Sequence, residues 1–122
     1  LADIYQCAET GGGALVATFP DKMNQAVCKQ MIDYLKRDRI GVLIEAGMPE
    51  GTQIAHKHGW ITNPASGIIQ NISDAGIVYT PAGNYVLVIY VYHPVQAVWE
   101  PVSRMFALIS QAVYNYYNLE AR

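Results

Sequence analysis

The stretch TQIAHKHGW, residues 52–60, is the first segment of this sequence with the character of a β-strand. It is also the only place where three hydrogen-bonding or charged side chains, His56, Lys57 and His58, run directly into a glycine, Gly59. Lysine supplies a point charge, and glycine lets a ligand approach the main chain. The stretch therefore suits the binding of a carboxylate or carbonyl group. The alternative is a surface strand whose polar side chains are simply hydrated.

Two further strands are predicted after this stretch, so it is expected to open an antiparallel sheet. The second covers residues 68–80 and is best defined at DAGIVY, residues 74–79. A short loop at residues 81–83 leads to the third, which runs from Asn84 to Tyr92. The third strand is apolar on both faces, which is typical of a central strand that is covered on both sides.

Helices are predicted before and after the sheet. Residues 1–10 form the first, which three glycines end in a plain turn or, alternatively, a hinge. Residues 21–37 form the second, with Asp21 as its N-cap, and residues 40–51 form a loop with at most one helical turn. A long final helix is expected to begin at Ala97 or Glu100 and to end at Asn118. Its apolar stripe is Val102, Met105, Phe106, Ile109, Ala112, Val113 and Tyr116.

Composition limits the classes of protein to which the chain can belong. Its 122 residues make one domain or a piece of a larger one, and 52% hydrophobic with 15% charged residues argues against disorder. A net charge of -2 without a basic cluster argues against a nucleic-acid partner. No apolar run reaches the roughly 18 residues of a membrane span. Because the sequence begins without methionine, we expect a mature or excised piece.

Two cysteines could form a disulfide, and two of the histidines could bind a metal ion. Cys7 and Cys28 lie on separate predicted helices, and two buried free thiols are favoured over a disulfide between them. His56 and His58 alternate onto one face of their strand and make a candidate pair of metal ligands. No nearby Cys, Asp or Glu completes a ligand set at the usual spacing. We therefore predict neither a metal nor another cofactor.

Three segments together carry a resemblance to a known family: Ala55-His56-Lys57-His58-Gly59, then DAGIVY at residues 74–79, then YVLV from residue 85. They resemble the C-terminal part of class A β-lactamase-type serine hydrolases and their penicillin-binding relatives, in which the first segment often reads Ala-His-Lys-Thr-Gly. The resemblance covers nearly the whole chain. It implies a partial α+β fold, with two helices in residues 1–40, then a three-stranded antiparallel sheet and a long helix packed on it in residues 52–122.

The resemblance also implies a substrate site and a reaction. Lys57, His58, Gly59 and Trp60 would contact a β-lactam or an acyl-peptide-like small molecule. Lys57 and His58 would bind its carboxylate, and the amide of His58 or Trp60 would form part of an oxyanion hole. The family's nucleophile lies in a Ser-x-x-Lys motif, and neither that motif nor Ser-Asp-Asn occurs here. We therefore expect a C-terminal fragment of an acyl-serine hydrolase, with no catalytic residue of its own and no activity alone.

One departure from the family favours an alternative function. His58 stands where the family has Thr or Ser, and its imidazole, partly charged near neutral pH, is expected to crowd the substrate groove. The alternative is a non-catalytic binding or structural relative. The expected partners are the missing N-terminal part of the domain or a second copy, bound at the unpaired outer edge of the strand from Asn84 to Tyr92. By resemblance, the protein is expected to be periplasmic or secreted in a bacterium, although these residues contain no signal peptide.

Overall fold

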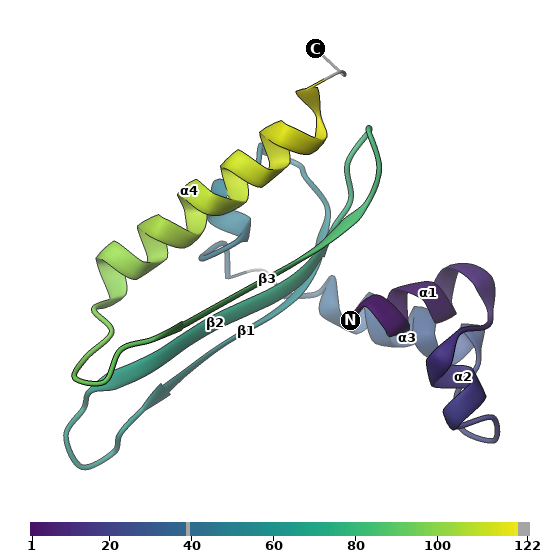
Figure 1. Ribbon diagram of the computed structural model, residues 1–122, viewed down its shortest axis with the longest axis horizontal. Helices are drawn as coiled ribbons and strands as arrows, with labels where there is room; N and C mark the ends of the chain where they lie inside the picture. Colours follow the sequence, from purple (N-terminus) through teal and green to yellow (C-terminus); the bar gives the residue numbers. More distant parts are fainter. Residues whose placement is uncertain (39, 120–122) are drawn as a thin grey trace.

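A computed structural model describes residues 1–38 and 40–119 of the chain. It contains helices α1 (Ala2–Thr10), α2 (Ala14–Thr18) and α3 (Gln25–Leu35), a 3₁₀ helix η1 (Glu45–Gly47), strands β1 (Ile54–Thr62), β2 (Ile69–Val78) and β3 (Tyr85–Tyr92), and helix α4 (Trp99–Tyr117). Helix α4 lies along one face of the sheet, and α1 to α3 gather near one end of the sheet on its other side (Figure 1). The predicted α+β fold is confirmed, with α2 as an additional short helix.

The sheet is antiparallel in the order β1-β2-β3. Within these residues β2 is the strand paired on both sides, so the central position that the apolar sequence of the third strand suggested is not found here. One set of β3 side chains is exposed, with Val88 at 62% and Tyr90 at 64%. An apolar strand sequence does not distinguish burial within one domain from a surface left for a partner. The unpaired outer edge expected for β3 is present in this structure.

The main core lies between the sheet and α4. Its buried members are Leu43, Ile44, Ile54, Ile72, Val78, Tyr85, Ala97 and Phe106. The stripe predicted for α4 was only partly right, because Phe106 is buried whereas Met105, Ile109 and Tyr116 are exposed. The helix is apolar around much of its circumference, so periodicity alone placed the buried face too broadly. The observed face includes the buried hydroxyl of Ser110.

A smaller core joins α1 and α3 to the opposite face of the sheet, and a disulfide between Cys7 and Cys28 crosses it. The prediction of two free thiols was wrong. The two helices pack side by side and bring the Cα atoms of the cysteines to 5.9 Å, which suits a disulfide. Disulfides persist in oxidising compartments, so this one is consistent with a location outside the cytoplasm. No helix within residues 1–38 and 40–119 has the length and apolar character of a membrane span.

Helix α3 begins later than predicted. Asn24, not Asp21, is its N-cap, and the Asn24 side chain accepts a hydrogen bond from the amide of Val27 at 3.0 Å. Asparagine and aspartate cap helices about equally well, so the sequence did not decide between the two positions.

The loop between α3 and β1 packs tightly against α4. The Ser110 hydroxyl donates to the Ile44 carbonyl at 2.9 Å, and this contact is buried. A Cβ atom at Gly47 would collide with the carbonyl oxygen of Ala107 and with the Ser110 side chain. The predicted single turn in this loop is confirmed as η1, and glycine is required there because the backbone of α4 approaches so closely. The loop therefore has a fixed position beneath β1.

Candidate functional site

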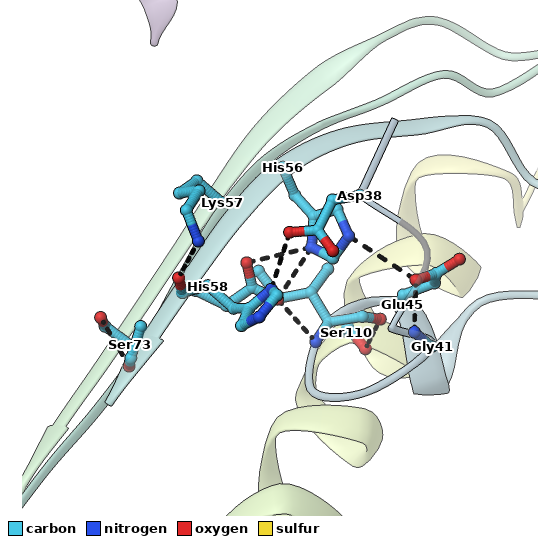
Figure 2. A network of polar contacts seen from close by, with 11 residues as sticks. Asp38, Gly41, Glu45, His56, Lys57, His58, Ser73 and Ser110 are labelled. Carbon is cyan, nitrogen blue, oxygen red and sulfur yellow. Dashed lines mark hydrogen bonds and ion pairs between the residues drawn. The ribbon is translucent and has the colours of Figure 1, made fainter. Parts of the chain in front are cut away.

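The four predicted binding residues lie on two faces of β1. Side chains alternate along a strand, so Lys57 and Gly59 share one face, and His58 and Trp60 share the other with His56. Figure 2 shows His56 and His58 directed to one side of β1 and Lys57 to the other. Strand β1 is at the edge of the sheet, and Lys57 is exposed on it. The structure therefore brings Lys57 and Gly59 together and separates them from the two aromatic side chains.

The face that carries Lys57 presents a small polar surface. The Lys57 ammonium donates to the carbonyl oxygen of His58 at 2.8 Å. Across the pair of strands, the Ser73 hydroxyl donates to the carbonyl oxygen of Gly59 at 3.2 Å (Figure 2). A cation, a hydroxyl and a side-chain-free backbone unit thus lie close together on an exposed strand. Such groups bind an anionic or carbonyl-bearing ligand.

The imidazole of His58 lies on the opposite face, where it contacts a carboxylate and an indole ring. Its Nδ1 is 2.9 Å from Asp38 Oδ2, and the side chain is almost fully buried. The ring stacks on Trp60 with 5.0 Å between centroids, and Trp60 meets Trp99 at the start of α4 edge to face. In this position the imidazole does not narrow the surface beside Lys57, which was the expected consequence of replacing the family's hydroxyl.

His56 is fully buried beside a buried carboxylate. Its Nδ1 is 3.1 Å from Asp74 Oδ1, and Asp74 Oδ2 accepts a hydrogen bond from the amide of Ile44 at 3.1 Å. Its Nε2 lies 3.6 Å from Glu45 Oε2, beyond hydrogen-bond distance. Room for the ring comes from Gly76 across the strand pair, where an added Cβ would lie 2.9 Å from the Cβ of His56.

Protonation of His56 is favoured by its neighbours. Burial lowers the pKa of His56, since it disfavours the charged imidazolium. The hydrogen bond to Asp74 and the negative charges of Asp74, Asp38 and Glu45 outweigh this effect, so the pKa is raised above the ordinary value of 6.5. The imidazolium is the charge partner that the buried Asp74 carboxylate requires.

We call His56, His58, Asp38, Glu45 and Asp74 the histidine–carboxylate cluster. The sequence correctly placed the two histidines on one face of the strand, but Asp38 and Glu45 were missed as their partners. These acids lie in a loop without periodicity, so no sequence pattern linked them to the strand. A polar hollow of about 260 Å³ lies next to the cluster and is lined by Lys36, Asp38, Glu45, Gly51, Thr52, Gln53 and Ile54.

The cluster shows no complete set of metal ligands. Within the described part of the chain, no three His, Cys, Asp or Glu side chains are grouped so that they could hold a metal ion. The described residues thus provide no third ligand for the metal site that was considered at His56 and His58. Both rings are instead paired with carboxylates.

Comparisons with known proteins agree on one family. The model of the β-lactamase enzyme family matches residues 16–117. Among solved structures, PBP-A is 26% identical over 85% of this chain and 36% of its own, with a TM-score of 0.65. The TLA-1 extended-spectrum β-lactamase is 22% identical over 84% of this chain and 38% of its own, with a TM-score of 0.67. A β-lactamase from Chitinophaga pinensis has the same coverage and TM-score at 18% identity.

These matches differ in what they show. At identities below 25%, the two β-lactamase structures show the fold alone. No curated protein sequence matches the chain. The chain spans a little over a third of the length of each of these solved relatives. The family model covers most of the chain. The α+β architecture of the chain is that of part of a β-lactamase domain. This chain therefore belongs to the β-lactamase enzyme family.

Proposed function

We propose that this chain is the C-terminal part of a serine hydrolase domain and carries its substrate-carboxylate-binding strand. In the full-length protein, a serine outside these 122 residues attacks a β-lactam or an acyl-peptide or ester and forms an acyl-serine intermediate. Lys57 binds the substrate carboxylate, and Gly59 allows the substrate to approach the backbone of β1. The His58 or Trp60 amide contributes to the oxyanion hole. The chain alone has no nucleophile motif and does not hydrolyse the substrate.

The observation that carries this proposal is the position of Lys57. Lys57 is exposed on an edge strand of the sheet, two residues before Gly59, whose carbonyl oxygen accepts the hydrogen bond from the Ser73 hydroxyl. A solved structure of PBP-A is described as an acyl-enzyme complex with penicillin G. Penicillin G carries a carboxylate, which is the group that an exposed ammonium on this strand is suited to bind.

Labelling with a fluorescent penicillin tests the proposal. The full-length protein is expected to acquire a label that survives denaturation, and Lys57→Ala should lower the rate of labelling at least tenfold, or about 1.4 kcal/mol. Lys22→Ala, which removes an exposed lysine far along the sequence, is the matched control and should label normally. A full-length protein that takes no label, or a Lys57→Ala variant that labels at the normal rate, overturns the proposal.

A second candidate function is a non-catalytic relative that binds a carboxylate ligand without cleaving it. The observation in its favour is His58, which replaces the family's hydroxyl and directs its side chain away from Lys57 toward Asp38. The same labelling experiment separates the two functions. Reversible binding of penicillin G that depends on Lys57, together with no covalent label on the full-length protein, identifies the non-catalytic relative.

The proposed partner and location follow from the same assignment. The outer edge of β3 would bind the N-terminal part of the domain or, in its absence, a second copy of the chain. The face of β3 beside that edge carries exposed Val88, Tyr90 and Tyr92. The Cys7–Cys28 disulfide supports a periplasmic or secreted location in a bacterium.

A further inference from the structure

We propose that His56 and His58 are positioning residues for Lys57: the two rings link the strand to Asp38 and to η1 beneath it, and the protonation of His56 sets how firmly the strand is held. The link to substrate binding rests on the proposed function. The mechanical link between the rings and the strand does not, because it depends only on contacts within this chain.

The two histidines bracket Lys57 in sequence and attach to the loop beneath it. His58 contacts Asp38, which follows α3, at 2.9 Å. His56 contacts Glu45 in η1 at 3.6 Å and Asp74 at 3.1 Å. Because side chains alternate, both rings point into the loop while Lys57 points to the exposed face (Figure 2). The backbone that carries Lys57 is thus anchored on both sides of that residue.

Residues on the loop side of these contacts are bonded to, or packed on, other elements of the fold. The Asp74 carboxylate accepts a hydrogen bond from the amide of Ile44, and the Ser110 hydroxyl donates one to the carbonyl oxygen of the same residue. Gly47 packs directly on the backbone of α4. In contrast, β1 is an edge strand whose ladder bonds reach β2 on one side only. The histidine contacts are therefore an additional restraint on the position of β1.

The charges around the rings make this restraint depend on pH. Among the residues that the structure describes, the groups facing them are Asp74 from β2, Glu45 from η1 and Asp38 from the segment after α3, and Lys36 lines the adjoining polar hollow. Helix α4 contributes neutral side chains, Ser110 beneath Ile44 and Trp99 against Trp60. With His56 neutral, the Asp74 carboxylate is buried without a cation in contact. Protonation of His56 gives Asp74 an ion-pair partner and so strengthens the link between β1 and the residues beneath it.

Nuclear magnetic resonance of the 122-residue chain tests the inference without any ligand. Amide shifts of Lys57, Gly59 and Trp60 and imidazole nitrogen shifts are recorded from about pH 5 to about pH 9. In the wild-type chain, the three amides should change with the midpoint of His56. Asp38→Asn should reduce the amplitude of that change at least twofold, since it keeps the shape of the side chain but removes its charge.

The controls separate positioning from mere stabilisation. His93→Gln removes the exposed histidine beyond β3 and should leave the titration of the Lys57 amide unchanged. His58→Gln breaks the contact with Asp38 and should likewise reduce the amplitude of the change at the three amides, whereas the direct effect of the His56 charge on nearby amides would remain. If His56→Gln fails to fold, Asp38→Asn and His58→Gln still decide the question. An amplitude at Lys57, Gly59 and Trp60 that neither Asp38→Asn nor His58→Gln reduces overturns the inference, whatever the outcome of penicillin labelling.

Discussion

Replacing Asp74 with asparagine is the most direct test of how the site is held together. The Asp74 carboxylate is buried and accepts hydrogen bonds from His56 Nδ1 and from the amide of Ile44. Asparagine has nearly the same shape, but it is neutral and keeps only one acceptor oxygen. Asp74→Asn therefore removes the charge and at least one hydrogen bond without opening a cavity.

The expected loss of unfolding free energy follows from those two contacts. A hydrogen bond to a charged group contributes about 1.5–3 kcal/mol, and breaking a buried ion pair costs about 3–5 kcal/mol. Because one acceptor remains, we expect a loss of about 2–4 kcal/mol near pH 6. This is a measurable part of the roughly 6–18 kcal/mol typical of a 122-residue chain.

The loss should also depend on pH in a defined direction. The raised pKa of His56 means that its contribution to stability is complete below about pH 6.5, the unfolded value, and disappears as pH rises through the folded value. The wild-type chain should therefore lose stability from about pH 6.5 upward. Asp74→Asn should make the stability depend less on pH. It removes the hydrogen bond to His56 and the negative charge that contributes most, among the neighbouring charges, to the raised pKa.

Urea unfolding followed by the fluorescence of Trp60 and Trp99 measures both effects, at about pH 6 and about pH 9. Asp21→Asn, an exposed aspartate outside the cluster, is the matched control and should change stability by less than about 0.5 kcal/mol. An Asp74→Asn loss below about 0.5 kcal/mol, or one of equal size at both pH values, would refute the ion-pair assignment.

Three further outcomes are expected. Gly47→Ala places a methyl group against α4 and should lower the unfolding free energy by about 1–3 kcal/mol in the same urea assay; no change would contradict the close packing of the loop. Joint replacement of Cys7 and Cys28 by alanine should cost about 3 kcal/mol for a sequence separation of 21, whereas an unchanged transition would mean that the disulfide is unimportant for stability. The chain should self-associate in light scattering at high concentration, and Val88→Lys on β3 should reduce this; a wild-type monomer at every concentration would contradict it.

The side chain of His58 connects separate parts of the fold. The resemblance of residues 55–59 to Ala-His-Lys-Thr-Gly led us to expect a hydroxyl at this position. The position carries instead a ring that reaches Asp38 on the far side of the strand, and Trp60 stacks on the same ring and contacts Trp99. His58 and Trp60 together thus connect the strand, the segment after α3 and the start of α4.

The sequence by itself determined most of the secondary structure, except α2 and the start of α3, and the alternation of β1. Periodicity located α1, α4 and all three strands to within a few residues, because each buries one regular face. It also placed His56 and His58 on one side of the strand and Lys57 on the other, since the period of two is a property of any extended chain. The family resemblance, carried by short motifs in order, was confirmed by the match over residues 16–117.

Tertiary structure decided what the sequence left open. Cys7 and Cys28 form a disulfide because α1 and α3 pack side by side, and pairing between separate helices has no local signal. β3 is an edge strand of this sheet. Its apolar sequence did not show this, because that sequence is the same whether the neighbouring strand lies within the chain or outside it. Asp38 and Glu45 reach the histidines from an irregular loop, and only the packing of that loop on α4 brings the charges together. Spacing along a chain specifies which side chains share a face, whereas the partner of each face is set by contacts between residues far apart in sequence.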